Sequence, residues 1–227
     1  MTSKNDRGES AGIQMKTLAL CLGAVIAVEA GTRLELQGKT VPPMVVLGGV
    51  RLLQAGLITL IVFVRHKRLR PIGLSLKELV PGLRRGLLWT GGFGLLVLLA
   101  GALLYVAGIH PLSLIHTPLP ARPGHILLFF IVGGLIAPVT EELFFRGVLY
   151  GYFRRWGAVA AILLSTLAFV LAHPVFPAIP ITQVVGGLLF ALAYEVEKNL
   201  MVPITLHSLG NTAIFGLSLI SQQGWAP

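Results

Sequence analysis

Long apolar runs, separated by short polar or proline-containing segments, set the pattern of this chain. The runs are continuously apolar and do not alternate with polar residues, which favours membrane-spanning helices over the strands of a barrel. Seven runs come near the roughly 20 residues that a helix needs to cross a bilayer. The sequence therefore predicts an all-α, polytopic transmembrane bundle with about seven spans. They cover residues 15–32, 43–64, 86–108, 125–154, 158–173, 181–195 and 200–221.

Two stretches differ from a simple span. Leucines mixed with Lys and Arg predict that 74–85 is a short amphipathic helix at the membrane surface, before the span 86–108. The run 125–154 is too long for one simple crossing, and Pro138 predicts a kink or a new helical start within it. We divide the chain into a disordered polar segment, an N-terminal membrane part with a basic amphipathic segment, and a catalytic core. These cover 1–14, 15–124 and 125–222.

Composition and charge agree with a membrane protein. Only 12% of the 227 residues are charged and 55% are hydrophobic, whereas a soluble domain has about 25% charged residues. Thirteen of the eighteen Lys and Arg residues fall on one side of a seven-span topology, and three fall on the other. The positive-inside rule then predicts a multi-pass protein with a cytoplasmic N-terminus and the C-terminus on the opposite side. The same rule explains the net charge of +9 without a nucleic-acid partner.

Charged residues within the apolar runs are the first sign of chemistry. Glu141, Glu142 and Arg146 follow the uncharged run 126–137, and each buried charge costs at least roughly 2.5–3.5 kcal/mol in a bilayer. Glu142 and Arg146 have the i,i+4 spacing of a helical ion pair, so we expect them to support the site. Glu141 points about 100° away. We therefore expect the two carboxylates not to face one partner, which leaves Glu141 for chemistry. Arg51, in the second run, is expected to pair with Glu29 or Glu35.

Three more polar residues lie in the last runs. His173 ends one of them, while His207 and Asn211 share a face of the last one at i,i+4 spacing. Each has a structural alternative, such as a cap on a helix C-terminus for His173, but as a set these groups favour function. Glu141, His173 and His207 would suit a zinc ion with water as fourth ligand. Alternatively, the carboxylate and one histidine activate water while the other histidine and the amide stabilise an oxyanion.

Other intramembrane protease chemistries are excluded by the residues available. The chain has no HExxH motif and no GxSxG motif. Asp6, in the polar leader, is the one aspartate, which excludes a mechanism with two aspartates. Cys21 is the one cysteine, so neither an intrachain disulfide nor a cysteine-based zinc site is possible. Amide hydrolysis by the Glu, His and Asn set remains.

The spacing of these residues is also that of a known family. Glu141-Glu142-x-x-x-Arg146, Phe169-x-x-x-His173 and His207-x-x-x-Asn211 resemble the three motifs of the CPBP intramembrane proteases. This family, also called Abi, comprises the CAAX prenyl endopeptidases and bacteriocin-processing enzymes. The resemblance covers about 125–221 and implies a helical fold with an intramembrane active-site cavity open to the bilayer.

The resemblance also implies roles for the residues. In a glutamate-type protease of this kind, Glu141 and His173 would activate the water, and His207 and Asn211 would form the oxyanion hole. Glu142 and Arg146 would position them. We expect no cofactor, although older descriptions of the family as metalloproteases make zinc on Glu141, His173 and His207 the alternative. The implied substrate is a membrane-associated protein or peptide, including a lipidated or tail-anchored one.

A function of another class remains open. A non-catalytic membrane scaffold or partner-binding protein would keep the same polar cluster for packing, since interhelical hydrogen bonds are common in membranes. Loss of Glu141 would then lower stability without abolishing a reaction. A transporter is less well supported, because the sequence shows no inverted repeat.

Overall fold

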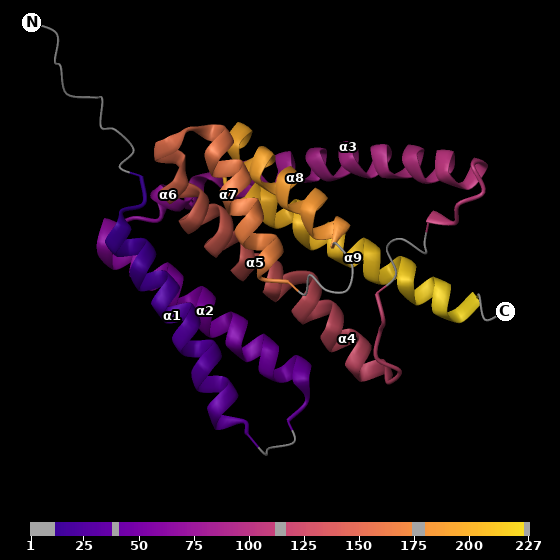
Figure 1. The fold of residues 1–227 in the computed structure, drawn as a ribbon, viewed down its shortest axis with the longest axis horizontal. Coiled ribbons are helices and arrows are strands. Elements are labelled where there is room, and N and C mark those ends of the chain that lie inside the picture. Colours follow the sequence, from indigo (N-terminus) through magenta and orange to yellow (C-terminus); the bar gives the residue numbers. More distant parts are fainter. Residues whose placement is uncertain (1–11, 38–40, 112–116, 174–179, 225–227) are drawn as a thin grey trace, which may run out of the picture.

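The computed structural model describes residues 12–37, 41–111, 117–173 and 180–224. Every regular element in this part of the chain is helical (Figure 1), which confirms the predicted all-α class. Residues 1–11, most of the segment predicted to be disordered, lie outside the described residues. The helices are α1 (Met15–Glu35), α2 (Pro43–His66), α3 (Leu79–Val106), α4 (Pro123–Ile131), α5 (Ala137–Glu142), α6 (Gly151–Phe153), α7 (Ala158–Leu171), α8 (Ile181–Glu197) and α9 (Met201–Gly224).

Among the described residues, five helical segments are long and apolar enough to cross a membrane. They are Met15–Glu35, Pro43–His66, Arg70–Val106, Pro123–Trp156 and Met201–Ser221. The other two predicted spans form α7 and α8, with 14 and 17 residues, which are shorter than these five. The structure thus supports a polytopic helical bundle with five candidate spans, and the count of seven stays a prediction.

A polar network joins α1 to α2 within their apolar surfaces. Arg51 Nη1 donates hydrogen bonds to Glu29 Oε1 at 3.1 Å and to Gln54 Oε1 at 2.8 Å. Gln54 Nε2 also donates to Glu29 Oε1, at 3.1 Å. The prediction of a glutamate partner for Arg51 is confirmed for Glu29. Because these three side chains are hydrogen-bonded to one another, the charged groups of Glu29 and Arg51 are tolerated between two apolar helices.

The predicted surface helix over 74–85 is wrong. Two short 3-10 turns, Arg70–Ile72 and Leu76–Glu78, precede a single helix that continues to Val106. Packing on α9 explains the difference. A Cβ on Gly82 would lie 2.5 Å from Asn199 Oδ1, and one on Gly86 would lie 2.6 Å from Thr205 Cβ. The first turns of α3 are therefore held against the bundle, while its later turns extend away from it (Figure 1).

The backbone between Pro123 and Trp156 stays helical throughout but changes its geometry. The π-helices Val132–Ile136 and Leu143–Tyr150 flank the short α5. Pro138 does not begin a separate helix, because the wider turn before it accommodates the residue. There the N–H of Ala137 bonds to the carbonyl of Val132, and the proline, which has no N–H, falls in the first turn of α5.

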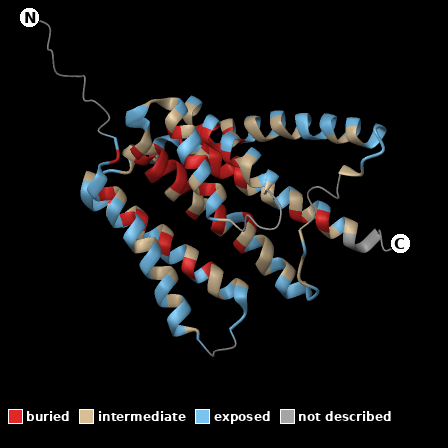
Figure 2. Ribbon diagram, in the orientation of Figure 1, coloured by how far each residue is buried: buried red, intermediate tan, exposed pale blue. Residues whose placement is uncertain are grey.

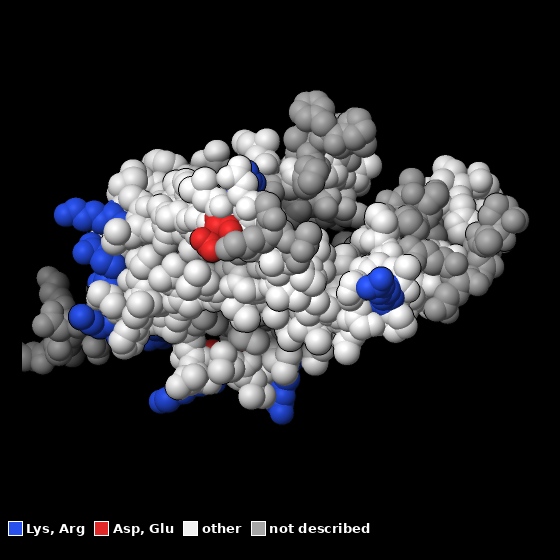
Figure 3. Space-filling model, turned by 90° about the horizontal axis from the view of Figure 1, so that it is seen from below, with Lys and Arg blue, Asp and Glu red and all other residues white. Residues whose placement is uncertain are grey.

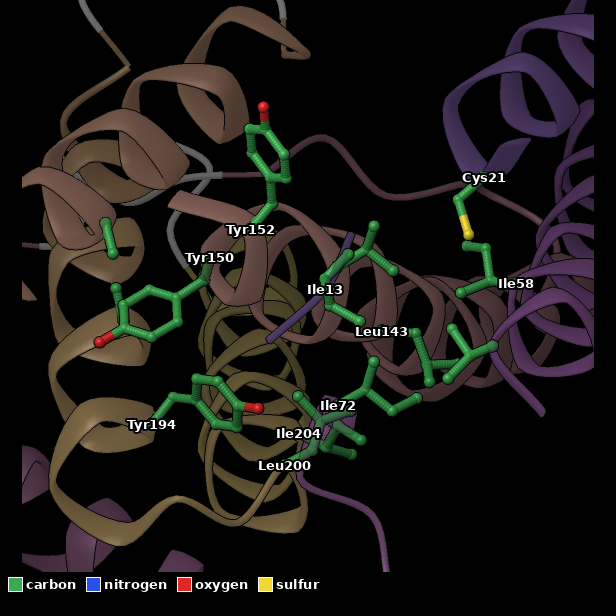
Figure 4. Close-up of a cluster of buried hydrophobic side chains, with 14 residues drawn as sticks. Ile13, Cys21, Ile58, Ile72, Leu143, Tyr150, Tyr152, Tyr194, Leu200 and Ile204 are labelled. Atoms are coloured by element: carbon green, nitrogen blue, oxygen red, sulfur yellow. The ribbon is translucent and has the colours of Figure 1, made fainter. Parts of the chain in front are cut away.

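Buried residues concentrate where α5, the π-helix after it, α8 and α9 meet (Figure 2). An apolar cluster there joins Leu143 and Tyr150 to Tyr194, Leu200 and Ile204 (Figure 4). Much of the remaining apolar surface is exposed, above all along α3. A helix that is apolar but uncovered is typical of a lipid-facing position. This core therefore fixes the position of the segment that carries Glu141, Glu142 and Arg146.

Candidate active site

The predicted site residues come together from three parts of the bundle. Glu141 and Glu142 end α5, and Arg146 lies in the π-helix that follows. His173 comes two residues after the end of α7. His207 and Asn211 lie on α9, which contacts both α5 and the π-helix before it. Segments up to about 70 residues apart in the sequence thus form one polar cluster.

A fully buried ion pair lies at the base of this cluster. Arg146 Nη1 donates to Glu142 Oε1 at 3.0 Å, and both side chains are 0% exposed. Arg146 Nη2 donates to the Gly187 carbonyl on α8 at 3.0 Å. The guanidinium carbon also lies 4.7 Å from the centre of the Phe169 ring, a favourable cation–π distance. The predicted Glu142–Arg146 pair is confirmed, and it links three helical segments.

His207 lies against this pair and contacts both carboxylates. Its Nδ1 is 2.8 Å from Glu142 Oε1, and its Nε2 is 3.9 Å from Glu141 Oε2. Because the same Glu142 oxygen accepts from Arg146, we assign the hydrogen of this bond to Nδ1. The expectation that the two glutamates would not face one partner is therefore wrong. The two nitrogens of one imidazole lie on different edges of the ring, so each edge meets a different carboxylate.

His173 faces Glu141 from the other side. Its Nδ1 is 2.8 Å from the Phe169 carbonyl, which only accepts, so Nδ1 carries the hydrogen and Nε2 of the neutral ring has the lone pair. This Nε2 is 3.9 Å from Glu141 Oε2. The bond to the last turn of α7 is the helix cap weighed as the structural alternative. Here the cap and the orientation toward Glu141 occur together, because the cap determines which nitrogen points inward.

Asn211 is close along the helix but makes a different contact. Its Nδ2 donates to the carbonyl of Gly133, in the first π-helix, at 2.9 Å. Its described hydrogen bond thus goes neither to Glu141 nor to a histidine. The amide is anchored one turn beyond His207, with its second N–H outside this bond. The structure places Asn211 beside the cluster rather than in contact with Glu141.

The spacing of the donors bears on the zinc alternative. Glu141 Oε2 lies 3.9 Å from Nε2 of both His173 and His207. Tetrahedral zinc ligands at 2.0–2.1 Å from the metal lie about 3.3–3.4 Å from one another. In the described part of the chain, no group of three or more His, Cys, Asp or Glu side chains has metal-binding spacing. The three donors, as placed here, therefore do not fit a zinc ion.

Comparison with known proteins agrees with this geometry. Residues 123–213 match the family described as type II CAAX prenyl endopeptidase, Rce1-like, and this range holds every residue of the cluster. Over these residues the chain is similar to the Rce1-like CAAX endopeptidases. A relative, the membrane-embedded CAAX protease MroQ of Staphylococcus aureus (strain USA300), is 34% identical over 110 residues. That match covers 45% of this chain and 43% of MroQ, and no solved structure matches.

The matched region (residues 123–213) contains neighbours of the cluster that the sequence did not predict. Phe190, on α8, stacks on the His207 ring with centroids 4.5 Å apart and an angle of 21°. It also lies 5.3 Å from the Arg146 guanidinium. Nothing distinguishes this phenylalanine from the other apolar residues of α8 in the sequence. Gly187, whose carbonyl accepts from Arg146, is only weakly indicated in the sequence: it forms a pair with Gly186, and small residues in an apolar helix often mark close helix packing.

The position of the described cavity differs from the expectation. A cavity of about 840 Å³ lies at the end of the bundle near Tyr150 and Tyr194. None of the four predicted catalytic residues lines it. Glu141 and His173 nevertheless remain accessible, because their side chains are 15% and 26% exposed. The cluster is thus reached from the surface of the bundle and not through this cavity.

Proposed function

We propose that this chain is an intramembrane endopeptidase that hydrolyses a peptide bond with a metal-free, glutamate-type mechanism. The observation that carries the proposal is the position of Glu141. Its carboxylate lies 3.9 Å from Nε2 of two histidines, His173 and His207. The Nδ1 of each ring is hydrogen-bonded elsewhere, to the Phe169 carbonyl and to Glu142 respectively. Two imidazoles of defined orientation around one accessible carboxylate can activate a water and stabilise the charge that develops.

In this proposal Glu141 and His173 bind the water. A water at a normal hydrogen-bond distance of about 2.8 Å fits between atoms that are 3.9 Å apart. The lone pair on His173 Nε2 and the carboxylate both accept its hydrogens, so the water oxygen is free to attack the carbonyl carbon. A C–O bond forms between the water and the carbonyl carbon while the Glu141 carboxylate, acting as the base, takes a proton from the water. The C–N bond then breaks, and the amine leaves with that proton.

His207 would stabilise the oxyanion in its protonated form. Because Nδ1–H already donates to Glu142, Nε2 can donate only when the ring is an imidazolium. Glu142 would orient the ring, in the way that a buried aspartate orients the histidine of a catalytic triad. Arg146 would hold Glu142 in place. The second N–H of Asn211 is the other candidate donor.

We infer that the substrate is a membrane-associated protein or peptide, including a lipidated or tail-anchored one. MroQ is named as a membrane-embedded CAAX protease, and the matched family is that of a prenyl endopeptidase. Because this chain spans less than half of the length of MroQ, its own activity and substrate remain proposals. We further propose that substrates reach the site from the bilayer, through an opening toward Glu141 and His173.

We also propose a multi-pass topology with a cytoplasmic N-terminus. Several Lys and Arg side chains project from one end of the molecule, at the left of Figure 3. In the sequence, basic residues also gather at the start of α1, the end of α2 and the start of α3. The positive-inside rule places that end in the cytoplasm and the end of α9 on the other side.

The test compares membranes that contain the wild-type chain with membranes that contain Glu141→Gln. Peptide-level mass spectrometry should find a product that the wild type releases and the variant does not. His173→Ala should abolish the same product, while Ser208→Ala, next to His207 but outside the proposed chemistry, should not. Melting temperatures in detergent show whether each variant folds. Losses of only severalfold in folded Glu141→Gln would refute the role of the carboxylate.

A scaffold function has one specific observation in its favour. Asn211 bonds to the backbone carbonyl of Gly133 in another helical segment, as a residue that only holds helices together would. A scaffold predicts that Glu141→Gln lowers the melting temperature and changes no peptide in the membrane. The same mass-spectrometry comparison therefore separates the two functions.

A further inference from the structure

The cavity at one end of the bundle lies outside the candidate active site. It forms where α1, α3 and α9 begin and where α8 ends. Its volume of about 840 Å³ is within the range of about 300–1,000 Å³ that is usual for ligand sites. Tyr150 in its wall is nine residues after Glu141. At about 1.5 Å per residue, the cavity is thus on the order of 13 Å from the proposed chemistry along one helical segment.

Four cations line the wall, and two of them are neutralised within the protein. Arg154 donates to both carboxylate oxygens of Glu195, at 2.9 and 3.0 Å, and Lys198 binds the same carboxylate. Two acidic residues of the wall, Glu78 and Glu197, both pair with Arg85 instead. None of these acids therefore neutralises the remaining two cations.

Arg70 and Arg155 have no acidic partner among the described residues. Arg155 donates to the carbonyls of Ile13 and Tyr152, at 2.9 and 3.0 Å, and its guanidinium carbon lies 3.8 Å from the centre of the Tyr152 ring, so none of these partners is an anion. Arg70 is exposed, and its side chain makes no ion pair or hydrogen bond within the described part of the chain. An arginine fork without an acid suits the oxygens of a phosphate.

The two arginines belong to segments that pack against each other. The Pro71 carbonyl lies 3.8 Å from where a Cβ on Gly151 would be, so the chain after Arg70 runs beside the turn that leads to Arg155. The Ile13 side chain is 3.0 Å from the same point. Arg70 and Arg155 therefore flank a single opening, and apolar atoms of Ile13 lie between their segments.

Aromatic residues place this opening at the level of lipid headgroups. Trp156 is 59% exposed and stacks on Phe153 with centroids 5.7 Å apart. Tyr150 and Tyr194 meet edge to face in the cavity wall (Figure 4). Tryptophan and tyrosine are enriched where a membrane protein crosses the membrane–water interface. At the membrane–water interface, the anions available to the opening are the phosphates of the lipid headgroups.

We propose that the cavity binds the phosphate of an anionic phospholipid headgroup between Arg70 and Arg155. Basic pockets between the helices of membrane proteins bind anionic headgroups in this way. The acyl chains would lie along the apolar outside of the bundle while the phosphate enters the opening. This site is separate from Glu141, and its occupation does not depend on the proposed proteolysis.

The experiment titrates the full-length protein in detergent with phosphatidylglycerol or phosphatidylcholine and counts bound lipids by native mass spectrometry. Wild type should retain phosphatidylglycerol in preference to phosphatidylcholine. Arg70→Gln should bind phosphatidylglycerol about fivefold more weakly, which is the usual effect of one cation near the membrane surface. Arg70→Lys should keep most of the binding. Lys77→Gln removes an exposed cation at the same end but outside the cavity wall, and should behave as wild type.

Each other outcome overturns the proposal. Equal retention of the two lipids by wild type would show that the cavity does not select a negative headgroup. Unchanged phosphatidylglycerol binding in Arg70→Gln and in Arg70→Gln/Arg155→Gln would place the lipid elsewhere. Displacement of the lipid by an equal concentration of inorganic phosphate or glycerol phosphate would assign the cavity to a soluble anion. Melting temperatures confirm that Arg70→Gln, which alters an exposed side chain, remains folded.

Discussion

The buried Glu142–Arg146 pair allows a test that separates structure from chemistry. Both side chains are 0% exposed, and Glu142 Oε1 accepts from Arg146 and from His207. Glu142→Gln leaves the guanidinium without a counter-charge, and Arg146→Met leaves the carboxylate without one. Breaking a buried pair by removing one partner costs about 3–5 kcal/mol. We expect each single variant to lose this amount of unfolding free energy.

The double variant should lose much less than the sum of the two. Glu142→Gln/Arg146→Met removes both charges, and the methionine keeps part of the packing between Phe169 and Phe190. The Gly187 carbonyl still loses its donor, which costs about 1–3 kcal/mol. We therefore expect a coupling energy of at least about 3 kcal/mol between the two sites, at the upper end of the usual range. Reversible unfolding of the full-length protein in mixed detergent micelles measures it.

A second pair in the same protein provides the control. Glu29 and Arg51 are also 3.1 Å apart, but their side chains are 39% and 26% exposed. Partly exposed pairs contribute about 0–1 kcal/mol, so Glu29→Gln/Arg51→Met should show a coupling below about 1 kcal/mol. Additive penalties for Glu142→Gln and Arg146→Met, within about 0.5 kcal/mol, would refute the reasoning. Proteolysis should be lost in the double variant even where it is folded, because a neutral amide replaces the carboxylate to which His207 Nδ1 is bonded.

Three further predictions concern packing, the oxyanion and metal. Gly82→Ala should destabilise the protein by about 1–3 kcal/mol, since its Cβ would lie 2.5 Å from Asn199. Gly91→Ala, where nothing lies within 4 Å, should be neutral or stabilising in the same unfolding assay. Asn211→Ala should lower kcat about 10²–10³-fold if its amide stabilises the oxyanion, whereas Thr212→Ala, on the exposed side of the helix, should leave it unchanged. Exhaustive chelation should leave turnover unaffected, and stoichiometric zinc by elemental analysis together with loss of turnover would contradict the metal-free mechanism.

The helices were largely predictable because continuous apolar runs require them. α1 and α2 begin at Met15 and Pro43 as expected, and the polar residues within the runs paired as their spacing and charge indicated. Glu142 with Arg146 is a local pair. The Glu29–Arg51 pair joins two helices, and it was predictable because an intramembrane charge needs a partner and few acids were available.

Local reasoning failed where contacts with distant residues decide the structure. Nothing within 74–85 shows that Gly82 and Gly86 pack on α9, so the beginning of α3 was predicted as a separate surface helix. The π-helices on either side of α5 were not predicted either, since their sequences resemble other apolar runs. Phe190 lies in the site because α8 packs against α7 and α9, and its own segment contains no indication of this.

The mistaken prediction about Glu141 and Glu142 shows what the site depends on. Neighbouring residues on a helix point about 100° apart, which excludes a shared partner only when that partner is a single atom. An imidazole has two nitrogens on different edges, so His207 accommodates the divergence. Its Nδ1 meets the buried carboxylate of Glu142, and its Nε2 faces the accessible carboxylate of Glu141. The divergence is therefore useful: one acid orients the ring from the protein interior, and the other is partly exposed, where a water and a substrate can reach it.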